Sequence, residues 1–158
     1  MSKNLKVMNL TEDNFKEFGS IISIKNRRPD VEDQKFGWYE KLGFFKETQN
    51  ISLNILKAKK REFEIDKLEY HKETPEAIIP IGGERVVVVV APEGDLDESK
   101  IKAFYINKNE GVMLNKRVRH FIPYPLEVDT ECLIVFKHGT GVDDLVYEQL
   151  SGVYKIEL

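Results

Sequence analysis

The 158-residue sequence predicts an all-β protein with one short N-terminal helix. Two observations support this. After residue 50, short runs rich in β-branched and aromatic residues follow one another, separated by glycine, proline, aspartate and asparagine, with no helical pattern between them. One run, Val86–Val90, is five consecutive valines whose two faces are both apolar, as in a strand covered by protein on both sides. We therefore expect an antiparallel sandwich or small barrel with this run in its interior-facing wall.

The first third of the chain contains one predicted helix, at about Thr11–Phe18. Its first residue has the position of an N-cap, and Leu10 and Phe15 stand where a hydrophobic staple would form. Gly19 is placed to end the helix. The following segment, Ile24–Gln49, is mixed and polar, and it predicts a long connection or an irregular hairpin.

Eight short strands are predicted after this connection, at a spacing of roughly 8–12 residues. Their sequences are ISLNILKA, FEIDKLEYH, EAIIPI, RVVVVVAP, IKAFYIN, GVMLN, RHFIPYPL and ECLIVFKHG. No internal repeat, low-complexity tract or linker interrupts them. We expect a single domain over residues 1–158.

Composition limits the setting and the partners of the protein. Hydrophobic residues make up 41% and charged residues 32%, and a net charge of −3 argues against a nucleic-acid partner. The apolar runs are too short to span a membrane as helices, and no secretory leader is visible. The single cysteine, Cys132, cannot form an internal disulfide, and we expect it to be buried in a strand. Together these features favour a reducing, cytoplasmic location.

The histidines and glutamates form a recognisable pattern. Glu69 and His71 share one face of a predicted strand, and Glu76 begins the next strand. The pattern Glu69-x-His71-x4-Glu76-x6-Gly83 has the spacing of the first cupin motif, with a glutamate in place of its first histidine. His120 follows 49 residues after His71, where the second motif has its histidine. In such a barrel, neighbouring strands direct alternate side chains into one pocket, so we expect a cupin-type antiparallel β-barrel, or jelly roll.

Plainer explanations apply to the remaining polar groups. A single histidine is more often a structural or surface residue than a ligand, and only the joint spacing favours a site that contains His71 and His120. His138 lies beside a predicted turn and is assigned a structural role. The basic run Lys57–Glu62 is expected to be a solvated loop.

Over almost its whole length the chain resembles the ureidoglycolate lyases of purine catabolism. The resemblance is carried by LTEDNFKEFGSII, ISLN, LEYHKETPEAIIPIGGERVVVVVA, IKAFYINKNEGV and VRHFIP, in this order. It implies a bicupin-like β-barrel, usually a homodimer, that takes part in allantoin degradation. It also implies a lyase that acts on a carbon–nitrogen bond, cleaving ureidoglycolate to glyoxylate and urea without a redox cofactor.

The chain departs from this family at several polar positions. Glu76 replaces a glutamine, Ile55 an arginine and Asn115 a histidine, while His120 stands alone where the family has a histidine pair. A glutamate can serve as an anionic ligand or as a base, whereas a glutamine cannot. No cofactor is expected from the family, but this change makes a divalent metal possible.

The expected site combines an acid–base set with substrate-binding groups. His120 or Glu76 would be the base, and His71 the acid or the group that orients the substrate. A bound Zn, Mn, Fe or Ni ion would use the same three residues, with Glu69 as a fourth candidate. The catalytic candidates are thus His71, Glu76 and His120, and the substrate-binding candidates are Glu69, Asn54, Lys116 and Arg117.

Three functions remain open on the sequence alone. The first is a lyase acting on a small ureido or hydroxy acid. The second is a binding protein for an organic acid or a sugar, without catalysis. The third is a metal-dependent isomerase or dioxygenase, which Glu76 would permit. In each case the partner is a small molecule rather than a nucleic acid or a membrane.

Overall fold

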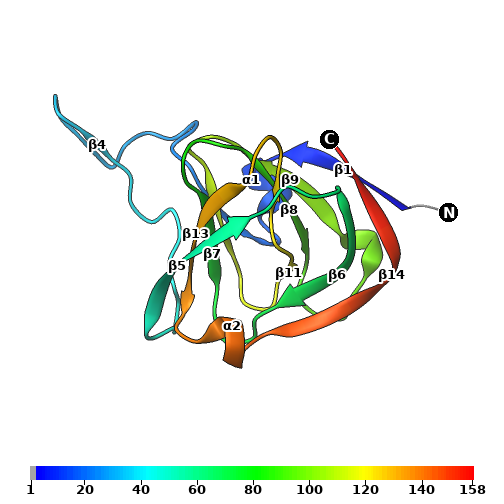
Figure 1. Cartoon of the computed structure of the whole chain (residues 1–158). Helices are drawn as coiled ribbons and strands as arrows, with labels where there is room; N and C mark the ends of the chain where they lie inside the picture. The colour runs from blue at the N-terminus through cyan, green and yellow to red at the C-terminus, as the bar shows by residue number, and fades with distance from the viewer. Residues whose placement is uncertain (1–2) are drawn as a thin grey trace.

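The computed structural model describes residues 3–158, and these form a nearly all-β molecule (Figure 1). The helical segments are α1 (Glu12–Phe15), α2 (Thr140–Asp143) and the short 3-10 helix η1 (Glu98–Lys100). The strands are β1 (Lys3–Asn9), β2 (Gly19–Ile22), β3 (Val31–Glu32), β4 (Gly37–Trp38), β5 (Ile51–Ala58), β6 (Glu64–Tyr70), β7 (Glu76–Pro80), β8 (Val86–Ala91), β9 (Lys102–Ile106), β10 (Gly111–Leu114), β11 (Arg119–His120), β12 (Tyr124–Pro125), β13 (Thr130–Lys137) and β14 (Val146–Glu157).

Most strands belong to two sheets, one of which closes on itself. The larger sheet has the order β11-β6-β14-β1-β9-β8-β12, and β11 also pairs with β8. This extra pairing closes six strands into a barrel. The second sheet has the order β2-β10-β7-β13-β5, so β5 is an edge strand. The cupin-type barrel is thus confirmed, with one departure from a purely antiparallel arrangement, because β1 runs parallel to both β14 and β9.

The valine run lies between two hydrophobic cores, as predicted. All of Val86–Val90 is buried in β8. Val87 and Val89 pack in a core formed by the closed sheet, together with residues such as Leu68 of β6. The alternate valines pack in a second core that contains residues of both sheets, such as Phe104 of β9 and Ile134 of β13. The strand therefore joins the barrel to the sheet that covers it.

The N-terminal helix is shorter than predicted. The Thr11 hydroxyl accepts a hydrogen bond from the Asn14 N–H (3.1 Å), and the Asn14 side chain accepts one from the Thr11 N–H (2.9 Å). The helix ends at Phe15, and the N–H of buried Phe18 donates to the Phe15 carbonyl in a tight turn. Gly19 then begins β2 instead of ending the helix. A Cβ atom at Gly19 would lie 1.8 Å from a carbonyl oxygen of β10, so only glycine fits this close strand approach.

Other expectations are confirmed in part. The long connection contains the hairpin β3–β4, which projects from the body of the molecule in Figure 1. The single strand predicted over residues 119–126 is divided into β11 and β12. Three strands, β1, β2 and β14, were not predicted. Cys132 is free and buried in β13, as expected. No helix in the described part of the chain is long and apolar enough to cross a membrane.

Candidate active site

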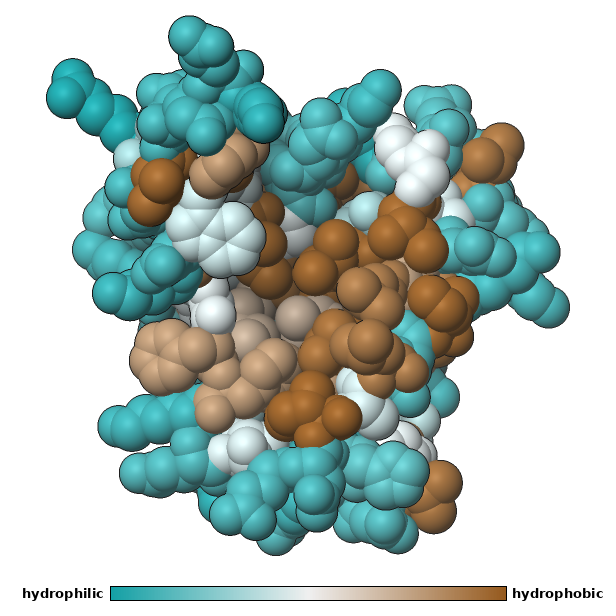
Figure 2. Space-filling view, turned by 90° about the vertical axis from the view of Figure 1, so that its left-hand side faces the viewer, coloured by the Kyte–Doolittle hydropathy of each residue, from teal (hydrophilic) through white to brown (hydrophobic). Residues whose placement is uncertain are grey.

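A cavity of about 430 Å³ is lined by β6 and β11 of the larger sheet and by β5, β7 and β13 of the second sheet. Segments after β11 and around α2 complete its wall. On the side of the molecule where β5 lies, Figure 2 shows a broad apolar area that is hollowed near its centre. A hollow bordered by apolar surface is typical of a small-molecule site.

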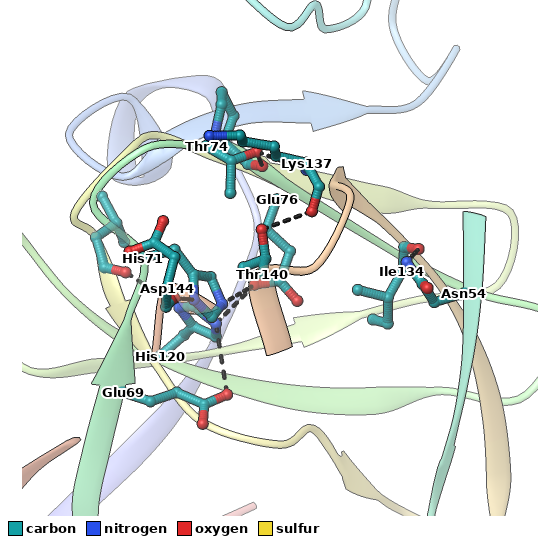
Figure 3. Close-up of polar contacts among 12 residues, drawn as sticks. Asn54, Glu69, His71, Thr74, Glu76, His120, Ile134, Lys137, Thr140 and Asp144 are labelled. Carbon is teal, nitrogen blue, oxygen red and sulfur yellow. Dashed lines mark hydrogen bonds and ion pairs between the residues drawn. The ribbon is translucent and has the colours of Figure 1, made fainter. Parts of the chain in front are cut away.

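Two histidines converge on one buried glutamate in this cavity (Figure 3). Glu76 Oε2 lies 3.0 Å from His71 Nε2 and 2.7 Å from His120 Nε2. The two imidazole rings are 5.0 Å apart between centroids. Glu69 Oε1 lies farther away, 3.8 Å from His120 Nε2. The strand pairing explains the convergence, because β11 places His120 directly opposite Glu69 of β6.

Backbone carbonyls fix the orientation of both rings. His71 Nδ1 lies 2.7 Å from the Asp144 carbonyl, and His120 Nδ1 lies 3.0 Å from the Val118 carbonyl. Because a carbonyl only accepts hydrogen bonds, each Nδ1 carries the proton and donates it. The Nε2 atoms therefore face the cavity and the carboxylates.

In this cluster, burial and the attraction between opposite charges shift the pKa values of Glu76 and His120 in opposite directions. Burial alone would raise the pKa of Glu76, but the positive charge of His120, 2.7 Å away, and the hydrogen bond with His71 outweigh it and lower the pKa to about 2. Burial would likewise lower the pKa of His120, but the Glu76 carboxylate raises it to about 9. At neutral pH, Glu76 is thus ionised and His120 is protonated.

Glu69 behaves differently from Glu76. Burial raises the pKa of Glu69, and the nearby Glu76 charge raises it further, against the opposing effect of His120. The site thus holds two carboxylates of different basicity beside the protonated imidazole of His120. Such a set can accept one proton and donate another.

The His120 Nε2 atom has an unusual environment. Its 2.7 Å approach to Glu76 is an ion pair, but the angles are not those of a hydrogen bond. Among the described residues, this buried nitrogen therefore has no hydrogen-bond partner. A ligand that enters the cavity could supply one, because buried polar groups are nearly always paired.

Glu69, His71 and His120 could hold a divalent metal ion, whereas Glu76, which was expected as a ligand, is not part of this group. One ligand atom each from Glu69, His71 and His120 lies within 4.8 Å of the others. Imidazole nitrogens with carboxylate oxygens are typical ligands for Zn, Mn, Fe and Ni. The backbone carbonyls bound to both Nδ1 atoms are the outer partners that metal-binding histidines usually have.

Not all of the expected site residues reach the cavity. Asn54 lines it, and its amide group donates to Ser52 Oγ (3.1 Å) and to the Ile134 carbonyl (3.2 Å). Lys116 and Arg117 border separate surface hollows. The tight turn before β11 directs them away from the cavity, with Arg117 at φ 66°. Among residues 3–158, no lysine or arginine lines the cavity.

Two groups at the site were missed from the sequence. His138, which was assigned a structural role, lines the cavity. Strand parity could have found it, because Ile134 and Phe136 of β13 also line the cavity at alternate positions. Asp144 orients His71 through its carbonyl, and its side chain accepts hydrogen bonds from the N–H groups of Lys72 and Glu73, both at 2.9 Å.

The fold and the cavity together define a cupin-type barrel protein with a histidine–glutamate site. Among solved structures, the TDP-fucose-3,4-ketoisomerase WlaRA from Campylobacter jejuni is similar in fold, with a TM-score of 0.50 at 10% sequence identity. The match covers 80% of this chain and 87% of that one. At this identity it supports the fold alone.

Sequence comparison identifies the family. The family model described as ureidoglycolate lyase matches residues 2–155. A ureidoglycolate lyase of Burkholderia mallei is 30% identical over 145 residues, which is 88% of this chain and 85% of the relative. One from Pseudomonas paraeruginosa is 30% identical over 146 residues, at 88% and 86% coverage. The chain belongs to the ureidoglycolate lyase family.

Proposed function

We propose that this protein is a lyase that cleaves ureidoglycolate, or a closely related ureido acid, into urea and a 2-oxo acid. The observation that carries the proposal is the convergence of His71 and His120 on Glu76 inside a cavity, in a chain that belongs to this family. The relatives from Burkholderia and Pseudomonas, named as ureidoglycolate lyases, support the same chemistry.

The reaction requires one base and one acid. Ureidoglycolate is a carbinolamine, so a base takes the hydroxyl proton while an acid protonates the departing urea nitrogen. Glu69 suits the role of base because its pKa is raised, and protonated His120 suits the role of acid. Each group, when well placed, contributes about 10²–10⁴-fold to the rate.

This assignment differs from the one expected from the sequence, where His120 or Glu76 was the base. A carboxylate with a pKa of about 2 is a weak base, and a histidine with a pKa of about 9 is already protonated at neutral pH. We propose that Glu76 instead holds His120 in its charged form. His71 would then orient the substrate.

A direct assay tests the proposal. Urea and 2-oxo acid release from ureidoglycolate is measured with the purified protein and with the His120→Gln variant. We expect the natural chain to release urea and the 2-oxo acid in equal amounts. In the variant, we expect the rate of release to be at least 100-fold lower. Equal activity of the two proteins would contradict the assigned role of His120.

A metal-dependent version of this reaction is the second candidate. The cluster of Glu69, His71 and His120 supports it. A divalent ion held there would polarise a substrate oxygen. Treatment with a chelator, followed by addition of Zn²⁺, Mn²⁺ or Ni²⁺, separates the candidates. Only a metal-dependent reaction would be lost after chelation and recovered after the metal ion is added.

We also propose that the protein is a cytoplasmic homodimer. The lone, buried Cys132 suits a reducing compartment.

The edge strand β5 exposes Ile51, Leu53 and Ile55 beside unpaired backbone groups, a surface that a partner strand can cover. We expect light scattering to give a dimer mass at micromolar concentration and a monomer mass for Leu53→Glu. An unchanged dimer in the variant would exclude this edge as the interface.

A further inference from the structure

The cavity is polar at one end and apolar over most of the remaining wall. The polar end is the cluster of Glu69, His71, Glu76 and His120, which Figure 3 shows together and apart from Ile134. The apolar wall consists of aliphatic and aromatic side chains from several strands and from the two segments at the mouth. They are Ile55 and Leu56 of β5, Ile78 of β7, Ile134 and Phe136 of β13, Phe121, Ile122 and Pro123 after β11, and Val142 and Leu145 around α2.

Ureidoglycolate alone matches this wall poorly. The molecule carries a carboxylate, a hydroxyl and a ureido group, and it has no apolar part. Against the apolar wall, these groups would lose water without gaining hydrogen bonds, which is unfavourable. The cavity volume of about 430 Å³ also lies within the range of about 300–1,000 Å³ typical of sites for considerably larger ligands.

Among residues 3–158, the polar end offers an anionic group one buried donor without a hydrogen-bond partner, the Nε2 atom of His120. The Glu76 carboxylate balances the charge of His120, and Glu69 is a second carboxyl group nearby, so the polar end has no excess positive charge. In the described part of the chain, no lysine or arginine side chain borders the cavity to bind a second carboxylate. The part of the ligand that reaches beyond the polar end must therefore be uncharged and, given the wall, apolar.

We propose that the site selects ureido acids whose reacting carbon carries an alkyl or aryl group R, which packs against the wall formed by β5, β7 and β13. The proposal rests on the lyase function proposed above and specifies its substrate class. The substrate is R–C(OH)(NH–CO–NH2)–COO⁻. Its C–N bond breaks, the hydroxyl proton passes to a carboxylate of the site, and the urea nitrogen receives a proton from His120. The products are urea and the 2-oxo acid R–CO–COO⁻, so no further reactant is needed.

The test is a series of 2-oxo acids that differ only in R. Binding of glyoxylate, 2-oxobutyrate, 2-oxohexanoate and phenylpyruvate to the full chain is measured by calorimetry in the presence of urea. We expect affinity to rise roughly fourfold for each added methylene until the wall is covered. Affinity that is constant or falls from glyoxylate to 2-oxohexanoate would overturn the proposal.

A matched pair of variants on β5 locates the effect. Ile55 lines the cavity and is 58% exposed, whereas Leu53, two residues earlier on the same strand, is 73% exposed and does not line it. Since both side chains are largely exposed, replacement by serine should leave the fold intact. Ile55→Ser should weaken 2-oxohexanoate binding severalfold more than glyoxylate binding. Leu53→Ser, which lies on the same proposed dimer edge, should leave the ratio of the two affinities unchanged. Equal effects of the two variants would contradict the proposed position of R.

Cleavage of ureidoglycolate and of the ureido acid in which R is butyl is measured on the same preparations, which separates the two proposals. A gain in affinity with chain length but no cleavage would overturn the lyase function and leave the apolar selectivity standing. Cleavage without any gain in affinity with chain length would overturn the apolar selectivity alone. If neither cleavage nor a gain in affinity is found, both the lyase function and the selectivity are overturned.

Discussion

Glu76 determines the charge state of the cavity. Its carboxylate is buried, contacts both histidines, and remains ionised because the charge of His120 and the hydrogen bond with His71 outweigh the cost of burial. A glutamine of nearly the same shape could not form this ion pair. The exchange of glutamine for glutamate, visible in the sequence, therefore has a definite electrostatic consequence.

Glu76→Gln should lower the pKa of His120 well below its present value of about 9 in metal-free protein. Burial would then act on the imidazolium with only the more distant Glu69 and the Val118 carbonyl to oppose it. NMR titration of the histidine ring protons measures the change. Glu69→Gln serves as the control, and it should produce a smaller decrease because its oxygen lies 3.8 Å away. A larger decrease in the control would show that Glu69 is the main partner.

His120→Ala should reduce both activity and stability. The substitution removes the proposed acid, and it leaves the buried Glu76 with His71 as its remaining partner. We expect a loss of about 1–3 kcal/mol in the free energy of unfolding, measured by urea denaturation. His138→Ala, at an exposed position of the same cavity, should change stability by less than about 0.5 kcal/mol. Equal losses in the two variants would contradict the importance of the ion pair.

At the scale of single elements, strand parity predicted most of the site. Glu69 and His71 share a face, and the chain then turns to bring Glu76 opposite them, a relation that depends only on local sequence. His138 obeys the same rule at the end of β13, but its position beside a turn suggested a structural residue. The contacts of Asp144 were not predictable, because they join segments more than 70 residues apart.

Asp144→Ala should impair catalysis more than binding. The alanine keeps the carbonyl that orients His71 but loses the side-chain bonds to the N–H groups of Lys72 and Glu73, so the turn after β6 is less firmly held. We expect kcat to decrease severalfold with a smaller change in KM, and Asp144→Asn to recover part of the loss. Steady-state kinetics measures both.

The neighbouring Asp143 provides the control for this prediction. Asp143 is exposed in α2, and Asp143→Ala should leave kcat unchanged. If both alanine variants lose kcat equally, the effect comes from general loosening of α2 rather than from the anchored turn.

At the scale of the whole molecule, the sequence predicted the barrel but not its closure. The valine run has two apolar faces, which required protein on both sides, and two cores are present there. The strands β1 and β14 were missed because each shows polar residues on its outer face, and Ser151–Gly152 interrupts β14 like a turn. Their parallel pairing joins the two ends of the chain, and no local pattern encodes such a contact.

The ion pair of Glu76 and His120 should make the stability of the metal-free protein depend on pH. The pKa of His120 is raised from 6.5 to about 9, so its stabilisation is complete below about pH 6.5 and is lost as pH rises through 9. The pKa of Glu76 is lowered from 4.5 to about 2, so its stabilisation is complete above about pH 4.5 and is lost as pH falls through 2. The contribution of the pair is therefore greatest between these limits, from about pH 4.5 to 6.5.

The alkaline side provides the sharper measurement. The rise in the His120 pKa corresponds to roughly 3 kcal/mol in the free energy of unfolding. The lowered pKa of Glu76 reflects the same interaction, so the contributions of the two residues are not added together. Urea denaturation at pH values from 6 to 10 should show the free energy of unfolding decreasing by an amount of this order. The double variant Glu76→Gln/His120→Gln, which has no charge at either position, should lose most of this slope. If the double variant keeps the same slope, other groups cause the decrease, and the buried pair does not contribute to stability in the way its geometry indicates.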